Sequence, residues 1–186
     1  MPHQEHIINS QPIFSGRVVN LRVDTIQTAT GQTYQREIIE HPGAVALVPL
    51  DEDGNVILVQ QYRAGAGQDL LEIPAGGLEP GETREACARR ELQEEVGLRP
   101  EELIELGDFY VAASYTTERI TIYLARGLRP SALEGDQDEE IAAQRVPFRR
   151  ALDMALVNEI RDSKTIIGLV WAARHLDRTG SLPGTP

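Results

Sequence analysis

Apolar and polar residues alternate along the first part of the chain, which predicts short β-strands. One alternating segment covers residues 14–24, a turn follows at Ala29–Gln32, and a second segment alternates over residues 34–40. A pair of strands alone is only marginally stable in water. We therefore expect residues 1–42 to form an antiparallel β subdomain that packs on the rest of the chain or on a second copy of it.

From residue 43 onwards, short apolar runs predict buried strands, and apolar periods close to 3.6 residues predict helices. The first two buried strands, residues 44–50 and 56–62, are expected to pair as a hairpin across the turn Asp51–Asn55. Further strands are predicted at residues 70–74, 103–110 and 120–125, and helices at residues 83–96, 149–158 and 163–176. This order favours an α/β fold with a mixed sheet and helices on its faces. Residues 128–140 are acidic and irregular, and residues 179–186 are predicted to be a flexible tail.

Size and composition are those of an ordinary globular protein. The chain has 186 residues, of which 41% are hydrophobic and 25% are charged. No apolar run approaches the roughly 18 to 20 residues that a membrane span needs, and the N-terminus lacks the pattern of a secretory signal. The single cysteine, Cys87, cannot form an internal disulfide and is expected to serve in packing. We therefore expect a cytoplasmic protein without a membrane partner.

The net charge of −11 argues against a nucleic-acid partner, because phosphate backbones are bound mainly by basic patches. A small phosphorylated substrate is compatible with this charge. It would require divalent cations and a few arginines to bridge two negative partners.

The predicted helix at residues 83–96 carries three carboxylates on one side. At 100° per residue, Glu91, Glu94 and Glu95 fall within an arc of roughly 100°. The neighbouring stripe is apolar and would seat the helix on a sheet; it comprises Ala88, Leu92 and Val96. A solvated, charge-rich helix is the alternative that these carboxylates alone leave open.

Clustered carboxylates repel one another, and a cation removes that repulsion. Two unit charges about 5 Å apart cost roughly 3 kcal/mol at an effective dielectric constant near 20. Oxygen ligands select a hard ion such as Mg²⁺ or Mn²⁺. Glu82 enters from the loop before the helix, and Arg90, beside Glu91, could hold Glu82 or another carboxylate in place. The pattern therefore indicates a metal site.

The spacing of these residues resembles the Nudix box, Gly-x5-Glu-x7-Arg-Glu-aliphatic-x-Glu-Glu-x-Gly-aliphatic. All of its defining positions match without a gap: Gly76, Glu82, Arg90, Glu91, Leu92, Glu94, Glu95, Gly97 and Leu98. Flanking segments resemble the ADP-ribose pyrophosphatase branch of that family, at residues 41–45, 61–63, 72–77, 117–119 and 162–165. The resemblance implies an α/β/α sandwich over residues 43–178, preceded by a β subdomain that forms a homodimer.

The resemblance also implies the cofactor and the reaction. Mg²⁺, with Mn²⁺ as the alternative, would be bound as two or more ions by Glu91 and Glu95, with Glu94 and the backbone carbonyl of Ala75 contributing. Glu82 would brace Arg90. The implied reaction is hydrolysis of the diphosphate of a nucleoside diphosphate-sugar, above all ADP-ribose to AMP and ribose 5-phosphate. The implied general base is a glutamate in the acidic stretch, for which Glu139 aligns best and Glu140 is the close alternative.

Several residues outside the box are candidate substrate contacts. Arg63 could pair with the diphosphate in bidentate fashion, the alternative being a surface salt bridge. Arg36 and Glu37 resemble a segment that meets the nucleotide across a dimer interface. Tyr34 could stack on adenine or belong to the core. Ser114 lies in a loop that resembles the same branch, although Ala113 stands where that branch commonly has proline.

Two other classes of function remain open. One is a hydrolase of GDP-mannose or of a damaged nucleoside triphosphate, although the N-terminal extension disfavours a small triphosphate hydrolase. The other is a non-catalytic nucleotide sensor. A sensor has no need to keep a costly carboxylate cluster, so the intact set of glutamates favours an enzyme.

Overall fold

The computed structural model describes residues 5–133 and 141–183. The chain divides into two compact units. The first unit combines residues 1–43 with residues 109–119, and the second combines residues 44–108 with residues 120–186.

The first unit contains an antiparallel sheet of order β1-β2-β3, formed by Glu5–Ser15, Asn20–Thr28 and Thr33–Glu40. The prediction of one strand over residues 14–24 is wrong. The chain reverses at residues 16–19, where the Gly16 amide donates to the Val19 carbonyl at 2.9 Å. Phe14 consequently pairs with Leu21 on the next strand. The alternating pattern continues through this turn, which is why it looked like a single strand.

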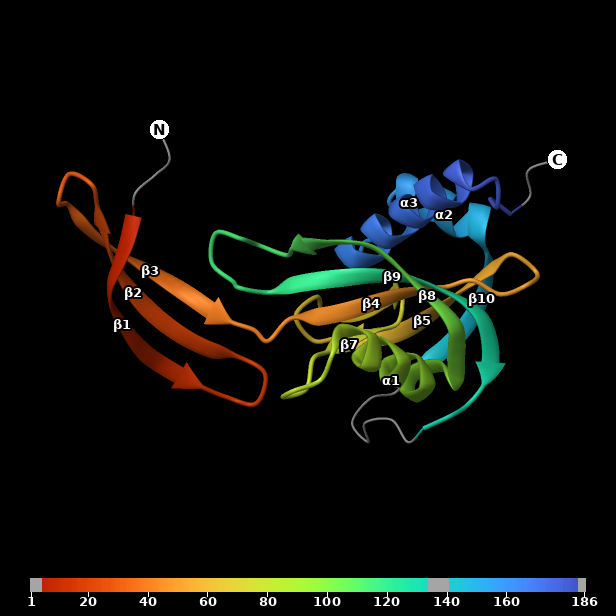
Figure 1. Ribbon diagram of the computed structural model, residues 1–186, viewed down its shortest axis with the longest axis horizontal. Coiled ribbons are helices and arrows are strands. Elements are labelled where there is room, and N and C mark those ends of the chain that lie inside the picture. Colours follow the sequence, from red (N-terminus) through yellow and green to blue (C-terminus); the bar gives the residue numbers. More distant parts are fainter. Residues whose placement is uncertain (1–4, 134–140, 184–186) are drawn as a thin grey trace. The chain divides into compact units, whose positions relative to one another are not determined.

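The second unit contains two sheets (Figure 1). A three-stranded sheet has the order β10-β5-β6, with bounds Ala142–Pro147, Asn55–Arg63 and Gln68–Glu72. A four-stranded sheet has the order β7-β4-β9-β8, with bounds Ala75–Gly77, Ala44–Pro49, Arg119–Pro130 and Leu98–Tyr110. This second sheet is mixed, because β4 pairs parallel with β9 and antiparallel with β7.

The predicted hairpin between residues 44–50 and 56–62 is also wrong. The turn itself forms, with the Asp51 carboxylate accepting the Asn55 amide at 2.8 Å. After a single bridge between Leu50 and Val56, however, the two strands separate into different sheets. The parallel partner of β4 is β9, which lies far along the chain and left no local signal. The prediction also missed β10, whose residues are mostly exposed.

The three predicted helices are confirmed with small shifts at their ends. They are α1 (Arg84–Val96), α2 (Phe148–Leu156) and α3 (Ser163–Arg178). Thr83 caps α1 by accepting the Ala86 amide, and Gly97 ends it in the left-handed conformation with φ of 70°. Asp162 caps α3 in the same way as Thr83 caps α1. Within the described ranges, no helix is both long and apolar enough to cross a membrane.

Helices cover both faces of the four-stranded sheet, which confirms the α/β/α sandwich (Figure 1). On one face, Cys87, Ala88 and Leu92 of α1 pack in a buried cluster with Val45, Leu47, Tyr123 and Ala125. On the other face, Gly168 of α3 approaches Val48 and Ile122 so closely that a Cβ there would lie 3.2 Å and 3.6 Å from their methyl groups. Alternate residues of β4 and β9 thus face different helices. The Glu91 and Glu95 side chains of α1 lie against β7.

Candidate functional site

Arg90 gathers the carboxylates of α1 and of the loop before it. Its Nε and Nη2 donate to the two oxygens of Glu82, each at 3.0 Å. Its Nη1 donates to Glu91 at 2.6 Å and to Glu94 at 2.9 Å. Nη2 also donates to the Gly77 carbonyl at 3.1 Å, which ties the helix to β7. We call Glu82, Arg90, Glu91 and Glu94 the Arg90 cluster.

The backbone of β7 lies directly against the carboxylates of Glu91 and Glu95. A Cβ on Gly76 would lie 2.0 Å from Cδ of Glu91 and 2.1 Å and 2.2 Å from its two oxygens. Only a residue without a side chain leaves room for this carboxylate, which is itself buried. One residue earlier, the Ala75 amide donates to Glu95 at 3.2 Å. The short strand therefore positions both Glu91 and Glu95.

The charge balance of the Arg90 cluster is negative. Three carboxylates against one guanidinium leave two negative charges in excess, and Glu95 stands beside them. The hydrogen bonds from Arg90 lower the pKa of Glu82 to about 2, so Glu82 is ionised at neutral pH. Burial raises the pKa of the Cys87 thiol to about 12, and its sulfur donates to the Gly77 carbonyl at 3.3 Å. Cys87 is therefore a packing residue, as expected.

The donor chemistry of this cluster fits a hard divalent cation. The acidic groups of the cluster are all carboxylates, whose oxygens are suitable ligands for such an ion. The excess of two negative charges equals the charge of one divalent ion. Among residues 5–133 and 141–183, no three acidic, His or Cys side chains converge on one point at metal-binding distances. The carboxylates meet instead at the guanidinium of Arg90.

A second charged network lies at the ends of β5 and β6 and at the start of α3. Arg63 donates from Nε and Nη2 to the two oxygens of Glu72 at 2.8 Å and 2.7 Å. Lys164 also pairs with Glu72, and with Asp162 at 3.1 Å. Glu72 and Lys164 are buried, whereas the Arg63 side chain is 36% exposed. We call these four residues the Glu72 network.

Sequence reasoning assigned no role to Glu72 or Lys164. Both lie in segments that resemble the ADP-ribose pyrophosphatase branch, and this resemblance was the available signal. The network is electrically balanced, with two cations and two carboxylates. The Thr165 hydroxyl accepts the Ile73 amide at 2.9 Å and so joins α3 to the end of β6. The network thereby fixes the orientation of Arg63.

The candidate nucleotide contacts lie in the first unit. Tyr34 and Arg36 are on β3, and the Arg36 guanidinium lies 4.5 Å from the centre of the Tyr34 ring. Glu37, the next residue on that strand, is exposed. Ser114 is exposed in the turn that begins at Ala112, whose carbonyl accepts the Tyr115 and Thr116 amides. The candidate bases Glu139 and Glu140 lie outside the described residues.

Comparisons with known proteins agree with this arrangement. A NUDIX domain model matches residues 40–166, which is more than half of the chain. A methanol dehydrogenase activator from Bacillus methanolicus is 39% identical over 170 residues, covering 90% of this chain and 92% of the relative. An ADP-ribose pyrophosphatase from Bacillus subtilis (strain 168) is 37% identical over 172 residues, with the same coverage of 90% and 92%.

A solved structure described as an ADP compounds hydrolase has a similar fold. It superimposes with a TM-score of 0.86 at 26% sequence identity and covers 95% of this chain and 96% of its own. The similarity therefore extends over the N-terminal strands as well as over the domain that carries α1.

Proposed function

This chain belongs to the Nudix hydrolase family, and we propose that it hydrolyses the diphosphate bond of ADP-ribose to give AMP and ribose 5-phosphate in a Mg²⁺-dependent reaction. The observation that carries this proposal is the Arg90 cluster, with two negative charges in excess against the backbone of Gly76. The similarity to an ADP-ribose pyrophosphatase over nine-tenths of the chain supports ADP-ribose among the nucleoside diphosphate-sugars.

Glu91 and Glu95 would hold the metal ions, with Glu94 and the Ala75 carbonyl as further ligands. Bound there, Mg²⁺ would neutralise charge on the diphosphate and lower the pKa of a water molecule. The protein holds these metal ligands in position before the ions bind. Gly76 leaves space for the Glu91 carboxylate, the Ala75 amide orients Glu95, and Arg90 fixes Glu82.

Arg63 binds the diphosphate in this proposal. Glu72 holds Nε and Nη2 of Arg63, so the guanidinium is oriented before substrate arrives and loses little conformational entropy on binding. A carboxylate in the acidic loop accepts the proton of the attacking water. We assign this role to Glu139, with Glu140 as the close alternative.

The N-terminal strands have a separate role. We assign dimerisation to residues 1–42 and catalysis to residues 43–178. Arg36 and Glu37, with Tyr34 and Ser114, contact the nucleotide. Exposed apolar residues on β1, including Ile7, Ile13 and Phe14, support a partner for this sheet. Gel filtration with light scattering measures the expected dimer, and a monomer at micromolar concentration would contradict it.

A substrate panel with one matched pair of variants tests the proposal. In Mg²⁺, AMP release from ADP-ribose should exceed turnover of GDP-mannose, diadenosine polyphosphates and 8-oxo-dGTP, ranked by kcat/KM. Glu95→Gln should lower kcat about a thousandfold, because it removes a charged ligand from the metal site. Glu85→Gln, at an exposed position of the same helix, should change it little.

Two results would contradict the proposal. A best substrate without a sugar-linked diphosphate would remove ADP-ribose as the substrate. Binding of panel members without turnover of any of them would make the chain a nucleotide sensor. Circular dichroism of Glu95→Gln would show whether its loss of activity is a loss of fold.

A further inference from the structure

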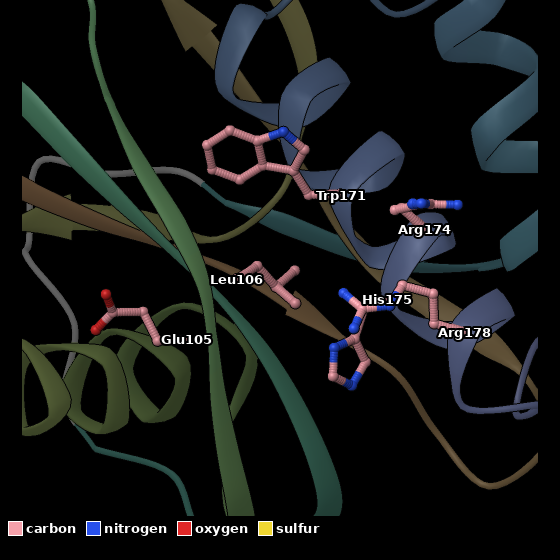
Figure 2. Close-up of a pocket in the computed structure, with 6 residues that line it drawn as sticks. All are labelled: Glu105, Leu106, Trp171, Arg174, His175 and Arg178. Carbon is pink, nitrogen blue, oxygen red and sulfur yellow. The ribbon is translucent and has the colours of Figure 1, made fainter.

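The last two turns of α3 carry a cationic and aromatic face. Trp171, Arg174, His175 and Arg178 are spaced at i, i+3, i+4 and i+7, which places them on one side of the helix. Figure 2 shows these side chains following one another along α3, with Leu106 of β8 on the side of the helix toward which Trp171 and Arg178 extend. Trp171 and Arg178 are seven and fourteen residues after Lys164, so about 10 to 21 Å of helix separates the residues of this face from Lys164.

A cavity of about 290 Å³ opens between this helix face and β8. Its volume lies just below the range of small-molecule sites, about 300 to 1,000 Å³. Glu105 also borders the cavity, but its carboxylate accepts the Tyr123 hydroxyl at 3.3 Å. Tyr123 packs in the buried cluster beneath α1, so the Glu105 carboxylate forms this hydrogen bond on the α1 face of the sheet and not on the α3 face. The charge presented by the helix side of the cavity is therefore positive.

This positive charge stands out in a protein with 29 acidic and 18 basic residues. Neither Arg174 nor Arg178 forms an ion pair with any residue in the part of the chain that the structure describes. Cations near a helix C-terminus are stabilised by the helix dipole, which accounts for their charge but not for the cavity beside them. The arginines thus offer guanidinium groups to an external anion.

Trp171 gives the cavity an aromatic wall held against the strand. A Cβ on Gly107 would lie 3.0 Å from Cζ3 and 3.3 Å from Cη2 of the indole. Gly107 has φ of 149°, so a larger residue is disfavoured there by both conformation and contact. The glycine allows the indole to lie directly on the backbone of β8, and Leu106 adds apolar surface nearby.

We propose that this cavity is a second ligand site and that it binds a nucleoside monophosphate. The phosphate is held by Arg174 and Arg178, whose planar guanidinium groups match the geometry of phosphate oxygens. The base lies against Trp171 and Leu106, since every base has a face that stacks on an aromatic ring. This site is separate from the Arg90 cluster and does not depend on the proposed hydrolysis.

The chain's single tryptophan makes the site directly measurable. Trp171 fluorescence and isothermal calorimetry would be recorded during titration with AMP, in EDTA to remove divalent ions from the catalytic site. A saturable change with AMP is expected, with weaker binding of adenosine, ribose 5-phosphate and inorganic phosphate. The first of these lacks the phosphate, and the other two lack the base.

Three variants assign the binding to this cavity. Arg178→Gln should weaken AMP binding about tenfold, the cost of one charge-assisted hydrogen bond. Arg99→Gln removes the same charge from an exposed position of β8 outside the cavity and should leave the affinity unchanged. Glu95→Gln should also leave it unchanged, which distinguishes this site from the catalytic one. Thermal unfolding of each variant verifies its fold.

The proposal is overturned if AMP gives no saturable change in fluorescence or heat. It is equally overturned if Arg178→Gln and Arg99→Gln bind AMP with the same affinity. If inorganic phosphate or ribose 5-phosphate binds as tightly as AMP, the base is not recognised and the nucleotide assignment is wrong. If adenosine binds as tightly as AMP, the arginines do not bind the phosphate and the nucleotide assignment is also wrong.

Discussion

The second unit contains two charged clusters that differ in balance. In the Arg90 cluster one guanidinium holds three carboxylates, whereas in the Glu72 network two cations and two carboxylates are matched. Both are anchored to the same short connection, since Glu72 ends β6 and Gly76 lies within β7. The Glu72 network is electrically balanced and needs no further ion. The Arg90 cluster requires a cation to neutralise its excess charge, so the two clusters have different functions.

The difference separates residues that bind from residues that position. Excess carboxylate at the Arg90 cluster repels itself unless a divalent cation is bound, so this cluster is suited to binding an ion. The Glu72 network is complete as it stands and holds the Arg63 side chain in place. Substitutions in the Arg90 cluster should therefore reduce catalysis with little loss of stability. Substitutions in the Glu72 network should reduce stability as well.

Of the substitutions that compare the two clusters, the largest effect is expected from Gly76→Ala. The new methyl group must displace the Glu91 carboxylate, whose Cδ lies 2.0 Å from the position of that Cβ. A shift of about 1 Å in a catalytic ligand can cost about a hundredfold in rate, and we expect a loss of that size in kcat. Steady-state kinetics with ADP-ribose and Mg²⁺ measure it.

Gly77→Ala is the matched control for this prediction. Nothing lies within 4 Å of a Cβ at Gly77, so the same added methyl group meets open space. Its kcat should stay within about twofold of the wild type, because surface substitutions usually have small effects. Equal losses in the two variants would mean that the space for Glu91 is not what matters at Gly76.

A smaller effect, on stability, is expected from Glu72→Gln. The substitution leaves Lys164 buried with only Asp162 as its partner and breaks the bidentate hold on Arg63. We expect the free energy of unfolding to fall by about 2 kcal/mol. Denaturant unfolding measures this change. Glu101→Gln, which breaks an exposed pair with Arg129, should cost less than about 0.5 kcal/mol.

The smallest effect is the pH dependence of that difference. Burial by itself raises the pKa of Glu72, but hydrogen bonds from Arg63 and attraction to Lys164 outweigh burial and lower it below its ordinary value of 4.5. A carboxylate with a lowered pKa stabilises the fold fully above the pKa of the unfolded chain. The stability difference between wild type and Glu72→Gln should therefore be constant between pH 6 and 7 and shrink as the pH falls below about 4.5. A difference that grows on acidification would contradict the assigned ion pairs.

Local patterns predicted the elements of the fold better than their pairing. The predicted helix at residues 83–96 lies within one residue of α1 at each end, because capping by Thr83 and Gly97 depends on contacts within one turn of the helix. The predicted partner of β4 was wrong. The turn after β4 predicts that the chain reverses, but it does not determine which sheet the next strand joins. The parallel pairing of Val45 with Thr121 depends on packing across the whole domain.

The same limit applies to the two charged clusters. Glu82 and Arg90 are eight residues apart, and a helix after a short loop brings them together predictably. Glu72 and Lys164 are separated by 92 residues, so only the folded chain shows their contact. For Arg63, sequence reasoning weighed a diphosphate contact against a salt bridge. The structure shows the salt bridge, with a buried partner, and the diphosphate contact remains a proposal.

We expect the excess carboxylate beside Gly76 to bind divalent cations, and anomalous diffraction from crystals grown with Mn²⁺ and a non-hydrolysable ADP-ribose analogue would locate them. Manganese peaks are expected within about 2.3 Å of carboxylate oxygens of Glu91 and Glu95, between these side chains and the diphosphate. Analogue bound with no peak at these side chains, and with Glu91 and Glu94 still held by Arg90, would contradict this expectation.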